Sequence, residues 1–188
     1  MFDPKRPEKI KVKLPDGLDY REAPEGSTLN DLMEAGQIEG LIGPRPPKNF
    51  YQNQNYGRVF SDTYGAVAEY YQNTQIFPIM HVVGIKKVLV SQYPWLPASL
   101  YKAFEEARKI ALHAILDTSA SKMTIPLIDE QIDFVHKELG PELWTYGFQN
   151  NRHVIDKFLE YHHLQCLSSR LLDAEELFHP SSMESYSL

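Results

Sequence analysis

The sequence contains a single cysteine, Cys166, so a disulfide bond within the chain is excluded. It also lacks any stretch near the roughly 18 consecutive apolar residues that a membrane-spanning helix needs. The first residues, MFDPKRP, have neither the apolar core nor the cleavage site of an export signal. We therefore expect a soluble cytoplasmic protein without a membrane span, unless an export signal precedes Met1.

Clusters of basic residues are missing as well. The chain has 19 lysines and arginines against 25 acidic residues, and no basic run is interleaved with aromatic residues. Nucleic acid is therefore excluded as a partner. The sequence has no H-E-x-x-H helix, no cysteine pair, no glycine-rich phosphate loop and no nucleophile elbow. We expect neither a metal nor a cofactor, and we exclude nucleotide-dependent and acyl-transfer chemistry.

The residue patterns that are present predict a few strands and several helices. Short or alternating apolar runs predict strands at residues 9–14, 38–43 and 79–85. Helical periodicity, capping residues and prolines predict helices at residues 29–36, 63–71, 98–116, 127–139 and 150–164, with another from Lys86 to the break at 93–97. Residues 48–58 are polar and aromatic without a period, which indicates a loop.

Two of the predicted helices have a clear apolar face. In the helix at 98–116 the face consists of Leu100, Phe104, Ala107, Ala111 and Ile115. On its polar side we expect Glu105 to pair with Lys109. In the helix at 150–164 we expect Val154, Ile155, Phe158 and Leu159 to point inward. These helices need more strands to cover than the sequence supplies, so we expect a sheet that is completed elsewhere.

Several segments together resemble one known family. They are IFPIMH at 76–81, YPWLPASLYKAF at 93–104, LWTYG at 143–147, NRH at 151–153, YHH at 161–163, ELFHP at 176–180 and the stretch 28–47 that ends in GLIGPRPP. Over nearly the whole chain from residue 7, the sequence resembles the 4,5-dihydroxyphthalate decarboxylases.

This resemblance implies an α/β fold of the type II periplasmic-binding-protein-like class, in which ligand binds between two lobes. On this map, residues 7–75 end lobe two, and residues 76–188 supply the return strand and the carboxy-terminal helices of lobe one. The amino-terminal part of lobe one would then be missing, so that the chain is a fragment. Cleft residues from that part cannot be assigned.

Two candidate site residues lie near predicted strands. Arg45 follows the strand at 38–43 in a proline-stiffened loop, where a guanidinium group could hold a substrate carboxylate. The alternative is an ordinary surface arginine. His81 lies within the apolar strand at 79–85, which the resemblance places at the hinge between the lobes. Its ordinary pKa of about 6.5 suits a catalytic proton donor, whereas the alternative is a hydrogen-bonded histidine of the core.

Three more candidates lie around the start of the last long helix. Trp144, Tyr146 and His153 could line a pocket for a planar ring, and the Tyr146 hydroxyl could bind a phenol or a carboxylate. The alternative is that these side chains fill the core at a helix start. We interpret His162 and His163 as structural.

Three hypotheses about function remain open. The first is cofactor-independent decarboxylation of a dihydroxyphthalate-like aromatic diacid by a carboxy-lyase, with His81 as the catalytic residue and a small aromatic carboxylate as the partner. The second is a solute-binding protein that captures a small anion for an ABC transporter, since fold alone does not fix function. The third is that the isolated chain is inactive and, with apolar surface uncovered, aggregates or forms a homo-oligomer.

Overall fold

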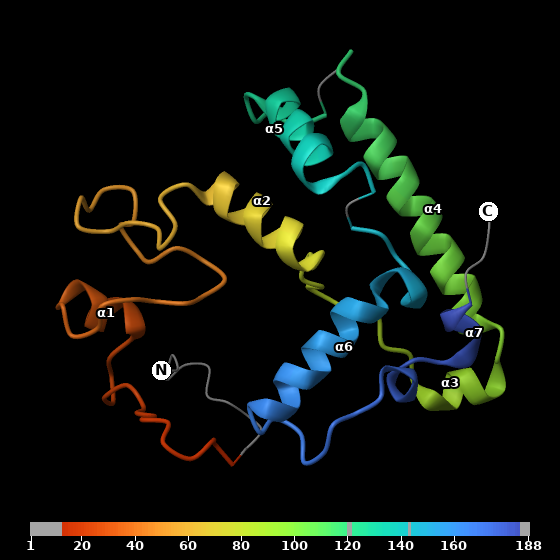
Figure 1. Cartoon of the computed structure of the whole chain (residues 1–188), viewed down its shortest axis with the longest axis horizontal. Coiled ribbons are helices and arrows are strands. Elements are labelled where there is room, and N and C mark those ends of the chain that lie inside the picture. The colour runs from red at the N-terminus through yellow and green to blue at the C-terminus, as the bar shows by residue number, and fades with distance from the viewer. Residues whose placement is uncertain (1–12, 120–121, 143, 185–188) are drawn as a thin grey trace.

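The computed structural model describes residues 13–119, 122–142 and 144–184, and within these ranges the chain is helical with irregular connections. Its elements are α1 (Leu29–Glu34), α2 (Thr63–Thr74), α3 (Lys87–Gln92), α4 (Leu96–Leu116), α5 (Ile128–Phe134), the π-helical turn η1 (Val135–Leu139), α6 (Phe148–Leu164), the 3-10 turn η2 (Ala174–Leu177) and α7 (Pro180–Met183). Figure 1 shows α1 and α2 on one side of α6, and α4 on the other.

The expected α/β fold of the periplasmic-binding-protein-like class is wrong, because no described residue lies in a strand. Residues 38–43 and 79–85 are irregular, and of the predicted strand at 9–14 only residues 13 and 14 are described, also as irregular chain. Residues 9–12 lie outside the described residues. The physical reason is that a strand needs a neighbouring strand to satisfy its backbone groups. No described segment supplies one, and Val82 stays 71% exposed.

The helices were predicted well because their signals are local. Thr28 caps α1 in a reciprocal arrangement with Asp31, whose backbone N–H donates to Thr28 Oγ1 at 3.2 Å while the Thr28 N–H donates to Asp31 Oδ2 at 2.8 Å. Pro97 occupies the first turn of α4, where its missing N–H costs no helical hydrogen bond. Gly140, with φ +90°, ends the α5–η1 segment as its sequence predicts.

The orientation of α4 was not predicted correctly. Apart from the half-buried Leu100, its predicted apolar face points to solvent, and Phe104 is 45% exposed. A neighbouring face is half-buried instead, with Tyr101, Glu105, Arg108 and Leu112 among its side chains. At about 100° per residue, these two faces differ by roughly a quarter turn around the helix.

The core of the described chain lies around α6. Phe148, Ile155, Leu159 and Ala174 form a buried cluster, against which Leu172, Phe178 and Met183 pack. Val154, Ile155 and Leu159 are therefore buried as predicted, whereas Phe158 is exposed and its prediction was wrong. The segment after α6 folds back, so that η2 and α7 both contact this helix and α7 also contacts α4. None of the described helices combines the length and the apolar character that crossing a bilayer requires.

Candidate functional site

The residues that lead into α6 form a loop fixed by side-chain hydrogen bonds. The Asn151 amide group donates to the carbonyl oxygens of Thr145 at 2.8 Å and of Gly147 at 2.9 Å. The Asn150 amide group donates to the carbonyl oxygen of Tyr146 at 3.2 Å. Both asparagines belong to the first turn of α6, so the helix itself holds the loop that carries Tyr146.

Gly147 allows this loop to approach α4 closely. Its φ of +100° and ψ of 150° lie in a region that essentially only glycine adopts. A Cβ atom at this position would lie 2.8 Å from the hydroxyl oxygen of Tyr101 on α4. The loop and α4 therefore meet at a point where a larger residue would clash.

Next to this contact, Tyr146 lies against a paired arginine. The Arg108 guanidinium carbon is 5.7 Å from the centre of the Tyr146 ring, a cation–π distance. Arg108 also donates two hydrogen bonds to Glu105, at 2.9 and 2.6 Å. The paired side chains are only 13% and 14% exposed, so both charges are largely withdrawn from water. Arg108 is thereby held in one orientation toward Tyr146.

This arrangement changes the acid–base properties of the α4 side chains. The hydrogen bond from Arg108 lowers the pKa of Glu105, and the same bond raises the pKa of Arg108. Burial raises the pKa of Tyr101, and the negative charge of Glu105 raises it further. At neutral pH the cluster therefore holds an ionised pair beside a neutral phenol.

Trp144 and His153 are brought together by the short segment that follows α2. The Trp144 ring lies edge-on to Phe77, with 5.5 Å between the ring centres. His153 Nε2 is 2.7 Å from the carbonyl oxygen of Gln75 and donates a hydrogen bond to it. Trp144 has φ +61°, a left-handed conformation that is uncommon for a bulky residue. Three of the predicted site residues, Trp144, Tyr146 and His153, thus lie around one loop.

Arg45 and His81 are not joined to this loop by any hydrogen bond, ion pair or ring contact within the described residues. Arg45 is exposed in the irregular connection between α1 and α2. His81 is exposed in the irregular segment between α2 and α3, so its expected place within an apolar strand is wrong.

No protein-family model matches the chain. A 4,5-dihydroxyphthalate decarboxylase from Comamonas testosteroni is 46% identical over 187 residues, which are 99% of this chain and 57% of that protein. A protein of the same name from Pseudomonas putida is 35% identical over 68 residues, or 36% of this chain and 26% of that protein.

The predicted resemblance to the 4,5-dihydroxyphthalate decarboxylases is confirmed. The chain nevertheless spans little more than half the length of the Comamonas decarboxylase.

Sequence reasoning missed Tyr101, Glu105 and Arg108 as members of the arrangement around Tyr146. The expected partner of Glu105 was Lys109, whereas the observed partner is Arg108. The polar side of α4 was interpreted as a solvated face because charged residues are mostly exposed. A signal was present, since Tyr101, Glu105 and Arg108 recur at steps of four and three residues and so share one helix face.

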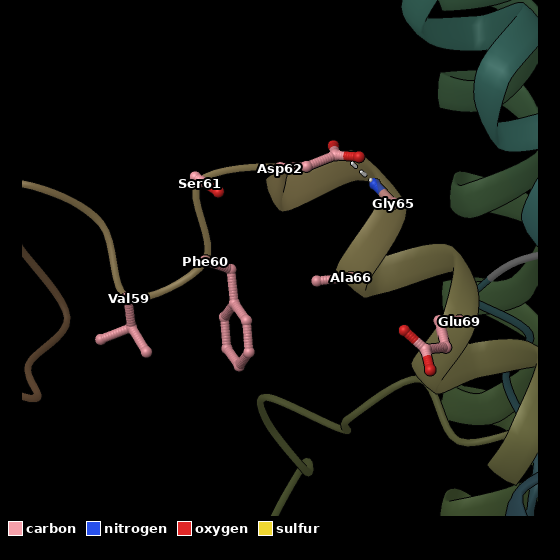
Figure 2. A pocket seen from close by; sticks show the side chains of 7 residues that line it. All are labelled: Val59, Phe60, Ser61, Asp62, Gly65, Ala66 and Glu69. Carbon is pink, nitrogen blue, oxygen red and sulfur yellow. Dashed lines mark hydrogen bonds between the residues drawn. The ribbon is translucent and has the colours of Figure 1, made fainter.

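A separate hollow near the start of α2 is unsuited to an anionic substrate. It is lined by Val59, Phe60, Ser61, Asp62, Gly65, Ala66 and Glu69 (Figure 2). The Asp62 carboxylate caps α2 by accepting a hydrogen bond from the Gly65 N–H at 2.9 Å, and Glu69 adds a second carboxylate. Two negative charges without a lining cation would repel a diacid.

Metal ligands do not gather in the described part of the chain. Across residues 13–119, 122–142 and 144–184, no group of three histidine, cysteine or acidic side chains lies close enough to hold an ion. The candidate site therefore consists of aromatic rings, the Arg108–Glu105 pair and His153.

Proposed function

We propose that this chain forms part of a carboxy-lyase that removes one carboxylate from 4,5-dihydroxyphthalate or a closely similar aromatic diacid. The observation that carries this proposal is the 46% identity over 187 residues to the Comamonas protein of that name. Because the match spans 57% of that protein, the activity belongs to the chain together with the rest of such an enzyme.

The reaction requires a proton donor and groups that bind and position the substrate, but no organic electron sink. A proton is added to the ring carbon that bears the departing carboxylate. The bond from that carbon to the carboxylate then breaks, its electron pair restores the aromatic ring, and carbon dioxide leaves. The phenol oxygens stabilise the protonated ring, so that the protein has to supply position, a proton and a partly dehydrated pocket.

We assign roles to five residues under this proposal. His81 donates the proton, because an imidazole is the side chain that most often transfers protons in general acid catalysis. Arg45 binds a substrate carboxylate, since none of the described residues forms a hydrogen bond or an ion pair with its guanidinium group. Trp144, Tyr146 and His153 line the pocket for the substrate ring. Their common position around the loop that leads into α6 supports this role.

The fixed loop is the structural feature that fits this chemistry best. Catalytic gain from positioning depends on side chains that stay in place before the substrate arrives. Asn151 fixes the backbone on both sides of Tyr146, and Arg108 contacts its ring. Tyr146 is thus presented in one orientation while remaining exposed enough to contact a ligand.

A chimeric enzyme tests the proposal. The matched part of the Comamonas decarboxylase would be replaced by this chain, and carbon dioxide release from 4,5-dihydroxyphthalate would be followed by mass spectrometry. We expect release that falls at least about hundredfold in His81→Gln, in line with the loss of a general acid. His113→Gln, which alters an exposed histidine of α4, serves as the control and should retain activity.

The decisive negative result concerns a chimera that is folded and binds the diacid. If such a protein releases no carbon dioxide, the decarboxylase proposal is wrong. If release continues unchanged in His81→Gln, the reaction stands and the assignment of the proton donor fails.

A further inference from the structure

The hydrogen bond made by His153 fixes which of its ring nitrogens carries the proton. Its Nε2 atom lies 2.7 Å from the carbonyl oxygen of Gln75. Because a carbonyl oxygen only accepts hydrogen bonds, Nε2 is the protonated nitrogen of the neutral ring. The lone pair of the neutral imidazole is therefore on Nδ1, where it can accept a proton.

The carbonyl group that sets this tautomer is itself held in place. Gln75 ends α2 in a left-handed conformation, with φ +54°. Its backbone N–H donates to the carbonyl oxygen of Tyr71 at 2.7 Å, and its side-chain amide donates to the same oxygen at 3.0 Å. Both bonds tie Gln75 to the last turn of α2. The contact between the end of α2 and His153 on α6 is therefore a fixed one (Figure 1).

The Nδ1 atom of His153 is available to a ligand. The side chain is exposed, and none of the described residues forms a hydrogen bond or an ion pair with Nδ1. The neighbouring charges on α6 are engaged elsewhere, since Arg152 pairs with Asp156 and Lys157 pairs with Glu160. The described part of the chain thus presents one basic nitrogen beside the loop that leads into α6.

The proposed substrate has a group that such a nitrogen can act on. In 4,5-dihydroxyphthalate, each carboxylate lies para to one hydroxyl group. When that hydroxyl group loses its proton, electron density rises at the ring carbon that bears the carboxylate, and this carbon accepts a proton more readily. A base placed beside the hydroxyl group therefore lowers the barrier to the first step of the reaction.

We propose that His153 is a catalytic base, which takes the proton of the hydroxyl group para to the departing carboxylate. This rests on the function proposed above. As Nδ1 accepts that proton, the ring carbon accepts one from His81, and the phenol C–O bond becomes a carbonyl. The bond to the carboxylate then breaks, its electron pair restores the aromatic ring and leaves a phenolate, and carbon dioxide departs. His153 returns its proton to the phenolate, and His81 is reprotonated from water.

His153→Gln in the chimeric enzyme tests the base. The glutamine amide nitrogen can still donate to the Gln75 carbonyl group, but the side chain has no basic nitrogen. We expect carbon dioxide release at pH 7 to fall at least about hundredfold relative to the unaltered chimera. This deficit should shrink about tenfold for each pH unit up to pH 9, because a phenol with a pKa of roughly 10 then ionises increasingly without help.

His113→Gln is the matched control, since it alters an exposed histidine of α4 in the same way. Its rate should equal that of the unaltered chimera at every pH. A deficit in His153→Gln that narrows as the pH rises supports the proposal. Full activity in this variant overturns it, and so does a deficit that is the same at every pH, because His153 would then only shape the pocket.

Two hydroxybenzoates give a readout that does not depend on carbon dioxide release. With the remaining carboxylate as reference, 3-hydroxybenzoate has the hydroxyl group that was para to the departing carboxylate, whereas 4-hydroxybenzoate has the other one. Calorimetric titration should show that His153→Gln weakens binding of 3-hydroxybenzoate by about threefold to tenfold and leaves 4-hydroxybenzoate unchanged. Equal effects on the two ligands, or none, overturn the role of His153.

Nitrogen-15 NMR of the 188-residue chain checks the tautomer directly. At pH 8 the His153 ring should carry its proton on Nε2, and the signal is identified by its loss in His153→Gln. A proton on Nδ1 instead overturns the proposal. If the unaltered chimera binds the diacid but releases no carbon dioxide, the proposed reaction fails, and the two hydroxybenzoates still decide whether His153 binds that hydroxyl group.

Discussion

Two regions of this chain differ in whether they bury any of their apolar side chains. In the carboxy-terminal region, residues 148–184, the apolar face of α6 is covered by the segment that folds back over it. In the region from 37 to 60, no residue is buried, and Ile42 and Val59 are almost completely exposed. Both regions contain aliphatic and aromatic residues, so composition does not explain the difference.

The difference lies in whether a partner segment is present. Arg152 on α6 reaches Asp173 and Glu175, and its guanidinium group also lies 5.4 Å from the Phe148 ring centre. Gln149 donates a hydrogen bond to the carbonyl oxygen of Met183 at 3.3 Å. The bonds from Arg152 to Asp173 and Glu175, and from Gln149 to Met183, join residues more than twenty positions apart. Residues 37–60 are connected mainly by their own turns. Two longer-range bonds join them to α1, from the Lys48 N–H to Asn30 and from the Asn49 amide group to Glu34.

Removing an apolar side chain should therefore matter in one region only. Leu159 is 4% exposed within the α6 cluster, and we expect Leu159→Ala to lower the free energy of unfolding by about 3 kcal/mol. Ile42→Ala, at a fully exposed site, should change it by less than about 0.5 kcal/mol. Guanidinium chloride unfolding followed by circular dichroism measures both. Equal effects would mean that the two regions do not differ in packing.

A pair of glycines sharpens the comparison at the start of the packed region. Gly147 (φ +100°, ψ 150°) and Gly140 (φ +90°, ψ 161°) have nearly the same backbone conformation. Replacement by alanine should cost about 1–3 kcal/mol at either position through backbone strain. Only at Gly147 does the new Cβ also meet the Tyr101 hydroxyl, whereas nothing lies within 4 Å at Gly140. Gly147→Ala should therefore unfold at the lower denaturant concentration.

Tyr101→Phe checks the cause of that difference. Because it removes the hydroxyl group in the way, Tyr101→Phe combined with Gly147→Ala should bring stability back toward that of Gly140→Ala. If the double variant is no more stable than Gly147→Ala with Tyr101 intact, contact with Tyr101 does not explain the difference.

The same comparison explains how far the sequence could be interpreted. Helices depend on local signals such as capping residues, prolines and glycines, and the structure has such signals at Thr28, Pro97 and Gly140. Burial depends on partners distant in the chain, and a one-dimensional pattern does not contain them. The apolar runs at 38–43 and 79–85 were therefore predicted as strands, although no described segment pairs with them.

The candidate site was predictable to a similar extent. The sequence indicated Trp144, Tyr146 and His153 as candidates around the start of the last long helix, and these residues lie around one loop. It did not indicate Arg108, because a charged residue on a helix is exposed far more often than it is placed against a ring. His81 and Arg45 remain predictions, since the described residues neither join them to the loop nor supply another role.

Removal of Arg108, the arginine beside Tyr146, should lower the free energy of unfolding by an intermediate amount. Arg108→Met leaves the half-buried Glu105 carboxylate without its partner, and we expect the free energy of unfolding to fall by about 1–3 kcal/mol. Arg108→Lys should recover only part of it, because an ammonium group cannot reproduce the two-point bond and the ring contact. Lys109→Met removes the same charge from an exposed neighbour and should change stability by less than about 0.5 kcal/mol. Similar losses in Arg108→Met and Lys109→Met would refute a special role for the pair.

The smallest expected change in stability concerns the exposed ion pair between Arg170 and Glu176, in the segment that folds back over α6. Two hydrogen bonds from Arg170 and one from the Asp173 N–H lower the pKa of Glu176 from 4.5 to about 2. Because the folded-state pKa is the lower one, this carboxylate stabilises the fold above pH 4.5 and loses that contribution as the pH falls toward 2. Solvent screening keeps the contribution small, since the pair is exposed.

Carboxyl-carbon NMR should therefore give Glu176 a titration midpoint near 2. Melting temperatures measured from pH 5 to pH 2 should fall less steeply in Glu176→Gln than in the unaltered chain, because that variant has no carboxylate to protonate at this position. Glu106→Gln provides the matched control, since Glu106 is an exposed α4 carboxylate with no ion-pair partner among the described residues. It should keep the original slope. An unchanged slope in Glu176→Gln would show that the Arg170–Glu176 pair does not stabilise the segment that folds back over α6. Apolar packing alone would then distinguish this region from residues 37–60.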